Sequence, residues 1–255
     1  MSHLIRGLFV FVLCVSLATP SAAASGTALG VDQDARRERG PEMITLDVGS
    51  DVFIGDRIIT DARGLVQIRF SDRTRLVVGP RSALVIEDYL LREDGSGGRF
   101  AVDALSGTFR FVTGGAPKDR YAIETPTGTI GVRGTAFDFN VAPDNTSVLL
   151  FNGALQLCNY AGDCIILDDE CQLGEAEVSA SRLLGFTTEI TGAARDALRA
   201  AFPYAVDESD LLGPFRVANA RSCLNRAVVI PQQDPVSNTT PDPEPQYRGN
   251  IITGP

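Results

Sequence analysis

The sequence contains a single histidine and no tryptophan, and its basic residues are outnumbered by acidic ones. The histidine, His3, lies in a leading segment that we expect to be removed, so the mature chain has no imidazole. Such a chain cannot use a Ser-His-Asp or Cys-His mechanism, nor bind zinc through histidine. The 23 Lys and Arg against 32 Asp and Glu give a formal net charge of -9. This acidity argues against a nucleic-acid partner and against a polybasic membrane anchor.

Long hydrophobic runs are also lacking. The stretch Leu8–Ala18 is apolar over 11 residues, short of the roughly 20 that a membrane-spanning helix needs. Arg6 precedes it and Ser21-Ala22-Ala23-Ala24 follows, which is the three-part pattern of a secretory signal peptide. We therefore expect residues 1–24 to be cleaved after Ala24, export to the periplasm or beyond the cell, and no membrane-spanning segment afterwards.

Cysteine is scarce, but its usage agrees with export. One of the five cysteines, Cys14, leaves with the signal peptide, and an even number remains: Cys158, Cys164, Cys171 and Cys223. Four cysteines allow three pairings. The turn-like linker at 159–163 favours a bridge between Cys158 and Cys164, which leaves Cys171 with Cys223. A metal cluster is the alternative, but the spacing is not C-x-x-C and no histidine is present.

The pattern of apolar residues over most of the chain predicts short strands. Between Met43 and about Val178 the apolar residues alternate with polar ones in runs broken by Gly, Asp and Pro. We expect an all-β domain at 25–190, either a β-sandwich or a short β-solenoid. A C-terminal extension at 191–230 begins with one short amphipathic helix over Thr191–Phe202, with Thr191 as N-cap and Pro203 as the stop. The Pro-rich segment 231–255 is expected to be a disordered tail.

The segment from Gly128 to Thr135 has glycines three residues apart but matches no phosphate-binding motif. Ile130 and Val132 have even residue numbers, whereas Phe137 and Phe139 have odd ones, so a regular strand would point the two pairs to opposite faces. A regular strand cannot bury both sets on one face, so an extra residue is expected at Gly134 as a β-bulge with positive φ.

The acidic clusters at 87–88 and 168–170 are candidates for acid–base chemistry or calcium binding. Adjacent residues of a strand point to opposite faces, so solvated edges or loops are the preferred interpretation. Asp56 follows Gly55 and is expected to close a turn through its own backbone.

Four runs of the sequence resemble the FecR domain: GDRIIT, LVVGPRS, GTFRF and TPTGTIGVRGT, followed by an NG hairpin. The resemblance covers residues 44–157. The residues that match its motifs are Gly55, Asp56, Thr60, Gly79, Pro80, Thr125, Pro126, Gly131, Arg133, Gly134 and Thr135. At the hairpin Ser71–Thr74, Arg73 stands where glycine is common, which predicts a different turn type.

The resemblance implies an extracytoplasmic β domain with no catalytic residues and no cofactor. Best-known members relay the occupancy of an outer-membrane receptor to a cytoplasmic anti-sigma segment, through a membrane helix. Here an export signal precedes the β domain almost directly, so a free-standing envelope module that binds an envelope protein or a cell-surface polysaccharide, in sensing or signal relay, is expected. The alternatives are an envelope carbohydrate- or wall-active hydrolase with paired carboxylates, and a structural cap or surface-assembly protein.

Overall fold

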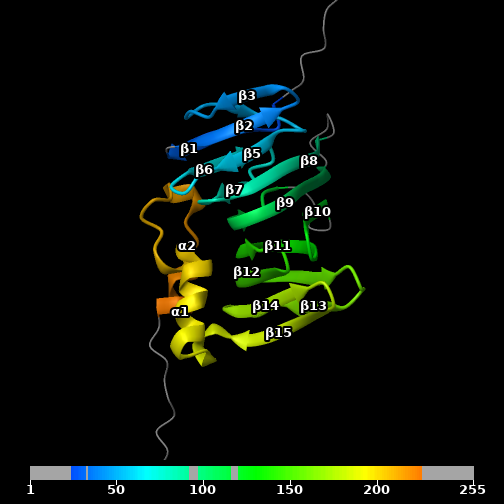
Figure 1. The fold of residues 1–255 in the computed structure, drawn as a ribbon, viewed down its shortest axis with the longest axis vertical. Helices are drawn as coiled ribbons and strands as arrows, with labels where there is room; N and C mark the ends of the chain where they lie inside the picture. The colour runs from blue at the N-terminus through cyan, green and yellow to red at the C-terminus, as the bar shows by residue number, and fades with distance from the viewer. Residues whose placement is uncertain (1–23, 33, 92–96, 116–119, 226–255) are drawn as a thin grey trace, which may run out of the picture.

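The computed structural model describes residues 24–32, 34–91, 97–115 and 120–225 (Figure 1). The expected signal peptide, apart from Ala24, and the Pro-rich tail lie outside the described residues. Within these ranges fifteen strands form one continuous sheet. They are β1 Gly26–Asp32, β2 Ala35–Arg39, β3 Glu42–Thr45, β4 Asp51–Val52, β5 Arg57–Thr60, β6 Leu65–Phe70, β7 Arg75–Val78, β8 Ala83–Leu91, β9 Gly97–Val112, β10 Tyr121–Thr125, β11 Gly128–Val141, β12 Asn145–Asn159, β13 Cys164–Leu167, β14 Gln172–Glu177 and β15 Ala180–Phe186.

The all-β prediction is confirmed, with strands that begin earlier and end later than the alternation indicated. Strands β1 and β2 precede Met43, and β15 ends at Phe186. The strands stack almost in chain order from β3 at one end to β15 at the other, as in a solenoid (Figure 1). No helix among the described residues is long and apolar enough to span a membrane.

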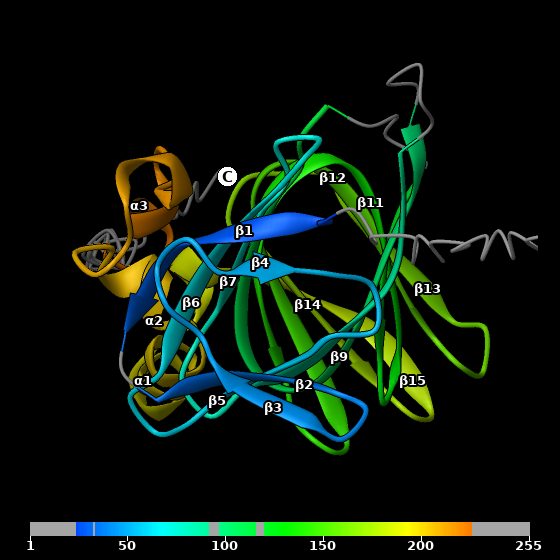
Figure 2. The same cartoon turned by 90° about the horizontal axis from the view of Figure 1, so that it is seen from above.

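The sheet is folded into two layers because three long strands change partners half-way. The first half of β9 pairs with β8 and β10, and its second half pairs with β7 and β11. The first half of β11 pairs with β10, and its second half with β9. The first half of β12 pairs with β14, and its second half with β13. Figure 2 shows these strands curving around one interior, as the two layers of a sandwich do.

A glycine with positive φ lies inside each of these strands: Gly107 at 108°, Gly134 at 72° and Gly153 at 82°. The β-bulge expected at Gly134 is confirmed, since the pairing of β11 with β12 shifts between Arg133 and Ala136. The shift changes the parity of the inward residues, so Ile130 and Phe137 are both fully buried in one core. The main hydrophobic core therefore lies between the layers.

The C-terminal extension covers the outer face of one layer (Figure 2). It contains α1 Gly192–Ala201, α2 Pro203–Val206 and α3 Ala220–Asn225, with the short 3₁₀ turn η3 Gly213–Phe215, and it follows the 3₁₀ turn η2 Thr187–Glu189 at the end of the β domain. Its buried side chains pack on outward-facing residues of β6, β7, β11, β12 and β14. The expected helix is confirmed as α1, and α2 and α3 were not predicted.

The helix α1 ends at Ala201, just before Pro203, as predicted, and Pro203 then opens α2, where its missing N–H costs no hydrogen bond. One detail differs, because only the C-terminal end of the apolar face expected for this helix packs. Leu198 and Ala201 are half-buried and Phe202 is fully buried, whereas Ala193, Ala194 and Ala197, expected on the same face, are exposed. Thr191 is at the N-cap position but its side chain makes no capping hydrogen bond.

Candidate functional site

The Gly55-Asp56 motif forms a buried turn. The Phe53 N–H donates to Asp56 Oδ2 at 2.8 Å, so Asp56 closes the turn as predicted. The sequence did not reveal that Asp56, which is fully buried, also accepts two hydrogen bonds from Arg39 at 2.6 and 3.0 Å. That hydrogen bonding raises the pKa of Arg39. The guanidinium also lies 4.3 Å from the ring centroid of Phe53, and the motif thereby attaches β2 to the turn before β5.

Thr60, Gly79 and Pro80 belong to one backbone junction. Thr60 Oγ1 donates to the Gly79 carbonyl at 2.5 Å and accepts from the Ser82 N–H at 2.9 Å. The Gly79 N–H donates to the Thr108 carbonyl at 2.8 Å. A Cβ on Gly79 would lie 2.8 Å from that Thr108 oxygen, so only glycine fits without a shift. These motif residues fix the connection from β7 to β8.

The TPTGT part of the motif is a buried hydroxyl chain at the turn from β10 to β11. Thr127 Oγ1 donates to Thr146 at 2.8 Å, and Thr146 Oγ1 donates to Thr125 at 2.9 Å. Thr125 Oγ1 in turn donates to the Gly128 carbonyl at 2.9 Å. Pro126 is exposed at the tip of the turn. The chain satisfies three buried hydroxyls and ties the turn to β12.

The remaining motif residues lie around the bulge. Gly131 is half-buried in regular register, and the Thr135 carbonyl accepts from the Thr113 N–H at 3.0 Å. Arg133 is exposed and borders a hollow of about 300 Å³ together with Ala154, Leu155, Gln156, Ile166 and Asp168. Arg133 is thus a motif residue whose charged side chain is exposed at the rim of a hollow.

The hairpin between β6 and β7 keeps a left-handed residue at the position where arginine replaces glycine. Arg73 has φ 70°, the left-handed region that glycine adopts without cost. Replacement of glycine therefore did not remove the left-handed turn. Asp72 accounts for this, since its carboxylate accepts from the Thr74 N–H at 2.9 Å and from the Tyr121 hydroxyl at 2.7 Å, and these bonds hold the turn.

A buried ion triad joins the sheet to the extension. Arg110 donates to Asp138 through Nε at 2.6 Å and Nη2 at 3.0 Å, and its Nη1 bonds Glu208. Arg110 and Asp138 are fully buried, and Glu208 is 8% exposed. Burial acts to lower the pKa of Arg110, but the two carboxylates outweigh it and hold that pKa above its ordinary value. The triad is a structural ion network with no opening to substrate among the described hollows.

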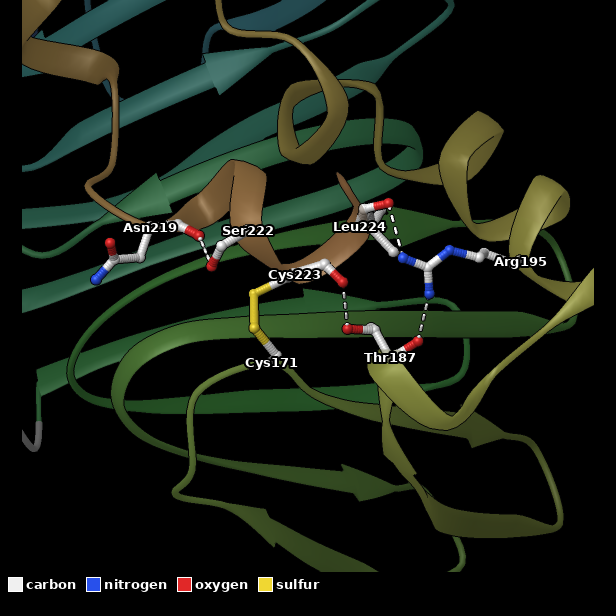
Figure 3. The surroundings of a disulfide bond; sticks show 7 residues. All are labelled: Cys171, Thr187, Arg195, Asn219, Ser222, Cys223 and Leu224. Carbon is white, nitrogen blue, oxygen red and sulfur yellow. Dashed lines mark hydrogen bonds between the residues drawn. A yellow bond between two sulfur atoms is a disulfide. The ribbon is translucent and has the colours of Figure 1, made fainter. Parts of the chain in front are cut away.

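Both expected disulfides are present. Cys158–Cys164 closes the hairpin of β12 and β13, and Cys171–Cys223 attaches α3 to the start of β14 (Figure 3). Around the second bridge, Thr187 Oγ1 donates to the Cys223 carbonyl at 2.6 Å and Arg195 donates to the Thr187 carbonyl at 2.9 Å. Glu170 lies close by, but the paired sulfurs offer no thiolate to a metal.

The sequence-predicted acidic clusters do not assemble. Glu87, Asp168, Asp169 and Glu170 are exposed, and the side chain of Asp88 lies outside the described part of the chain. The hollow beside Arg133 has one carboxylate in its lining, that of Asp168, and the two hollows beside Arg73 have none. The preferred interpretation as solvated edges agrees with this arrangement.

Comparison with known proteins gives one family. Residues 56–156 match the model of the FecR protein family. No curated protein matches the chain. Two crystal structures of a proposed anti-sigma factor from Parabacteroides distasonis are similar at 12% and 13% identity, with TM-scores of 0.41 and 0.42. The alignments cover 56% and 60% of this chain, and 63% and 64% of those chains, less than two thirds of each. Every motif residue except Gly55 lies in the matched segment, and residues 56–156 of this chain therefore match the FecR domain.

Proposed function

We propose that this chain is a non-enzymatic FecR-domain interaction module of the cell envelope, which binds a macromolecular partner in sensing or signal relay. The observation that carries the proposal is the match to the FecR domain, since its motif residues are used in turns and in hydrogen bonds to neighbouring strands rather than in a reactive centre. The surface, including the hollow beside Arg133, is left for a partner, either an envelope protein or a cell-surface polysaccharide.

Export is part of the proposal. Two disulfides favour an oxidising compartment. Strand β1 begins at Gly26, so cleavage after Ala24 would leave every described strand intact. We also propose that 25–190 and 191–225 act as one unit, because the extension shares a buried core and a disulfide with the β domain.

The hydrolase alternative is disfavoured because the carboxylates that come together are paired with arginine side chains. Asp138 and Glu208 converge on the buried guanidinium of Arg110. Glu175 and Glu177 converge at the surface, but both are paired with Arg182. Hydrolysis by paired carboxylates needs both groups on an accessible substrate, with one of them free to give a proton.

A second candidate is a surface-assembly role, and the edge strands favour it. Strands β3, β13 and β15 each pair along one side only, and each exposes an apolar side chain: Met43, Ile166 and Leu183. Unpaired edges are templates for pairing with another chain. Self-association in solution, measured by sedimentation, separates this role from binding of a different partner.

The test is to express the full chain with a C-terminal tag and recover the exported protein. We expect an N-terminus near Ser25, no free thiol, and retention of a defined envelope component. The matched control is the same protein reduced and unfolded before capture. An intact Met1 or four reactive thiols would refute export, and equal retention by the unfolded control would refute specific binding.

A further inference from the structure

Three arginines gather at the hairpin of β6 and β7, on a protein that is acidic overall. Arg69, Arg73 and Arg75 border a hollow of about 410 Å³, together with Thr113, Gly114 and Gly115. A second hollow of about 330 Å³ shares Arg69 and Arg73 and continues past Gly26 and Thr27 of β1. The two hollows are adjoining parts of one basic groove, which we call the arginine groove.

The arrangement works against stability. Arg69 and Arg75 are directly opposite one another across β6 and β7, and like charges in that position repel. Arg75 is half-buried, its Nη1 donates to the Pro214 carbonyl, and its buried Nε has no hydrogen-bond partner. Burial lowers its pKa. An anion in the groove would relieve the repulsion, because it would shield the two positive charges from one another.

The carboxylate nearest in sequence is held within the hairpin itself. Asp72, within the same hairpin, already accepts hydrogen bonds from the backbone and hydroxyl of Thr74 and from the Tyr121 hydroxyl. Asp51 lies across β1 from the second hollow and accepts from Thr27 Oγ1 at 3.3 Å. No ion pair to Arg69, Arg73 or Arg75 is found among the described residues.

The shape of the groove selects the class of ligand. A guanidinium binds carboxylate or phosphate with two parallel hydrogen bonds. Two hollows with shared arginines suit a chain that repeats its charge rather than one small ion. Both β6 and β7 are paired on each side, so neither has a free edge to which a peptide could add as a strand. The side chains that line the first hollow are those of Arg and Thr, with the backbone of two glycines.

From these observations we infer that the arginine groove binds an acidic polysaccharide, through carboxylate or phosphate groups on neighbouring sugars. The inference rests on the proposed function, since it assigns one partner class to the interaction module. It requires Arg69 and Arg73 to contact the charges and Arg75 to contribute at the inner end of the groove.

The experiment is a calorimetric titration of the purified protein with four probes: oligogalacturonate, phosphorylated dextran, neutral dextran and polyglutamate. The variant is Arg69→Gln with Arg73→Gln. The matched control is Arg57→Gln with Arg63→Gln, which removes the same charge from exposed arginines away from the groove. Thermal melting verifies folding, and the variant should melt no lower than wild type because like-charge repulsion is reduced.

We expect oligogalacturonate or phosphorylated dextran to bind wild type, and neutral dextran not to bind. The variant should bind at least tenfold more weakly, with less than a twofold loss in the control. The slope of log affinity against log salt should fall by about one to two for the two lost charges. Preference between the two acidic probes identifies carboxylate or phosphate as the group recognised.

Several outcomes would overturn the inference: equal weakening in both double variants, unchanged affinity in the groove variant, tighter binding of polyglutamate than of either acidic sugar, or no binding at all. Capture of envelope components by wild type and by the groove variant tests the interaction role and the arginine groove separately. If wild type and groove variant capture the same component, the groove is refuted and the interaction role stands. If wild type captures nothing, the interaction role itself fails.

Discussion

Removing the Cys171–Cys223 bridge should destabilise the protein more than removing Cys158–Cys164. The first bridge joins residues 52 apart and the second joins residues 6 apart. In the loop-entropy model these separations contribute about 4 and about 2 kcal/mol respectively. The longer bridge is also buried beside Leu224 and Phe202, so its loss adds a packing defect, whereas Cys164 is exposed.

The measurement is urea unfolding of wild type and two double variants, Cys171→Ala with Cys223→Ala and Cys158→Ala with Cys164→Ala. Circular dichroism is the appropriate signal, because the chain has no tryptophan. A single transition is expected in each protein, since Glu208 and Phe215 still hold the extension to the sheet. An equal or reversed ranking would refute the loop argument. A separate early transition in the first variant would show that the extension is an independent unit.

Three further predictions concern the bulge at Gly134, the buried side chain of Tyr204 and the ion triad of Arg110, Asp138 and Glu208. Gly134→Val should lower the free energy of unfolding by about 1–3 kcal/mol, because φ is 72° at this position. Gly131→Ala should leave it nearly unchanged, because the nearest atom to an added Cβ is 3.9 Å away. Equal losses of stability in thermal melts of the two variants would contradict this ranking. Burial raises the pKa of Tyr204 above 10, so the folded state keeps a proton that the unfolded chain releases, and the free energy of unfolding should fall as pH rises above about 10. Tyr204→Phe, which also removes an unpaired buried hydroxyl, should make the free energy of unfolding fall less steeply above about pH 10. If the pH profile of this variant is the same as that of wild type, Tyr204 is not the group responsible. Glu208→Ala should cost about 3 kcal/mol, because it removes two hydrogen bonds to a carboxylate, one of them from Arg110; a loss below about 1 kcal/mol in urea unfolding would indicate that the triad carries little stability.

Local signals predicted much of the fold. Period-2 alternation indicated the strands, because each strand has one face in the core. The parity change between Val132 and Phe137 located the bulge at Gly134. The short turn-like linker identified Cys158 and Cys164 as partners, and the remaining pair followed by elimination.

The same parity change occurs in the other long strands and could have been found there. In β9 the buried residues are Val102 and then Phe109, and in β12 they are Leu150 and then Leu155. Each pair has opposite parity and is separated by a glycine with positive φ. What the sequence could not reveal is that the two halves of each strand pair with different neighbours, because pairing depends on residues far along the chain.

The ion triad could not be predicted from the sequence for a similar reason. Arg110 lies between Phe109 and Phe111, and Asp138 lies between Phe137 and Phe139, so alternation predicts that both charged side chains face solvent. They face away from the core, but the extension covers that face, and Glu208 comes from 98 residues beyond Arg110. A polar residue in a strand pattern therefore marks the outer face of the sheet without telling whether another segment covers it.

That cover restricts where a partner can bind. The inner faces of both layers are filled by the main core, and the extension occupies the outer face of one layer with Phe202 and Phe215. The surfaces left for recognition in the described part of the chain include the strand edges, the hollow beside Arg133 and the hairpin of β6 and β7. Of these, the hairpin carries Arg69, Arg73 and Arg75, for which no ion pair is found among the described residues, and Arg69 and Arg75 face one another at a cost to stability. If the proposed groove is correct, an anionic partner engages the protein at the β6–β7 hairpin.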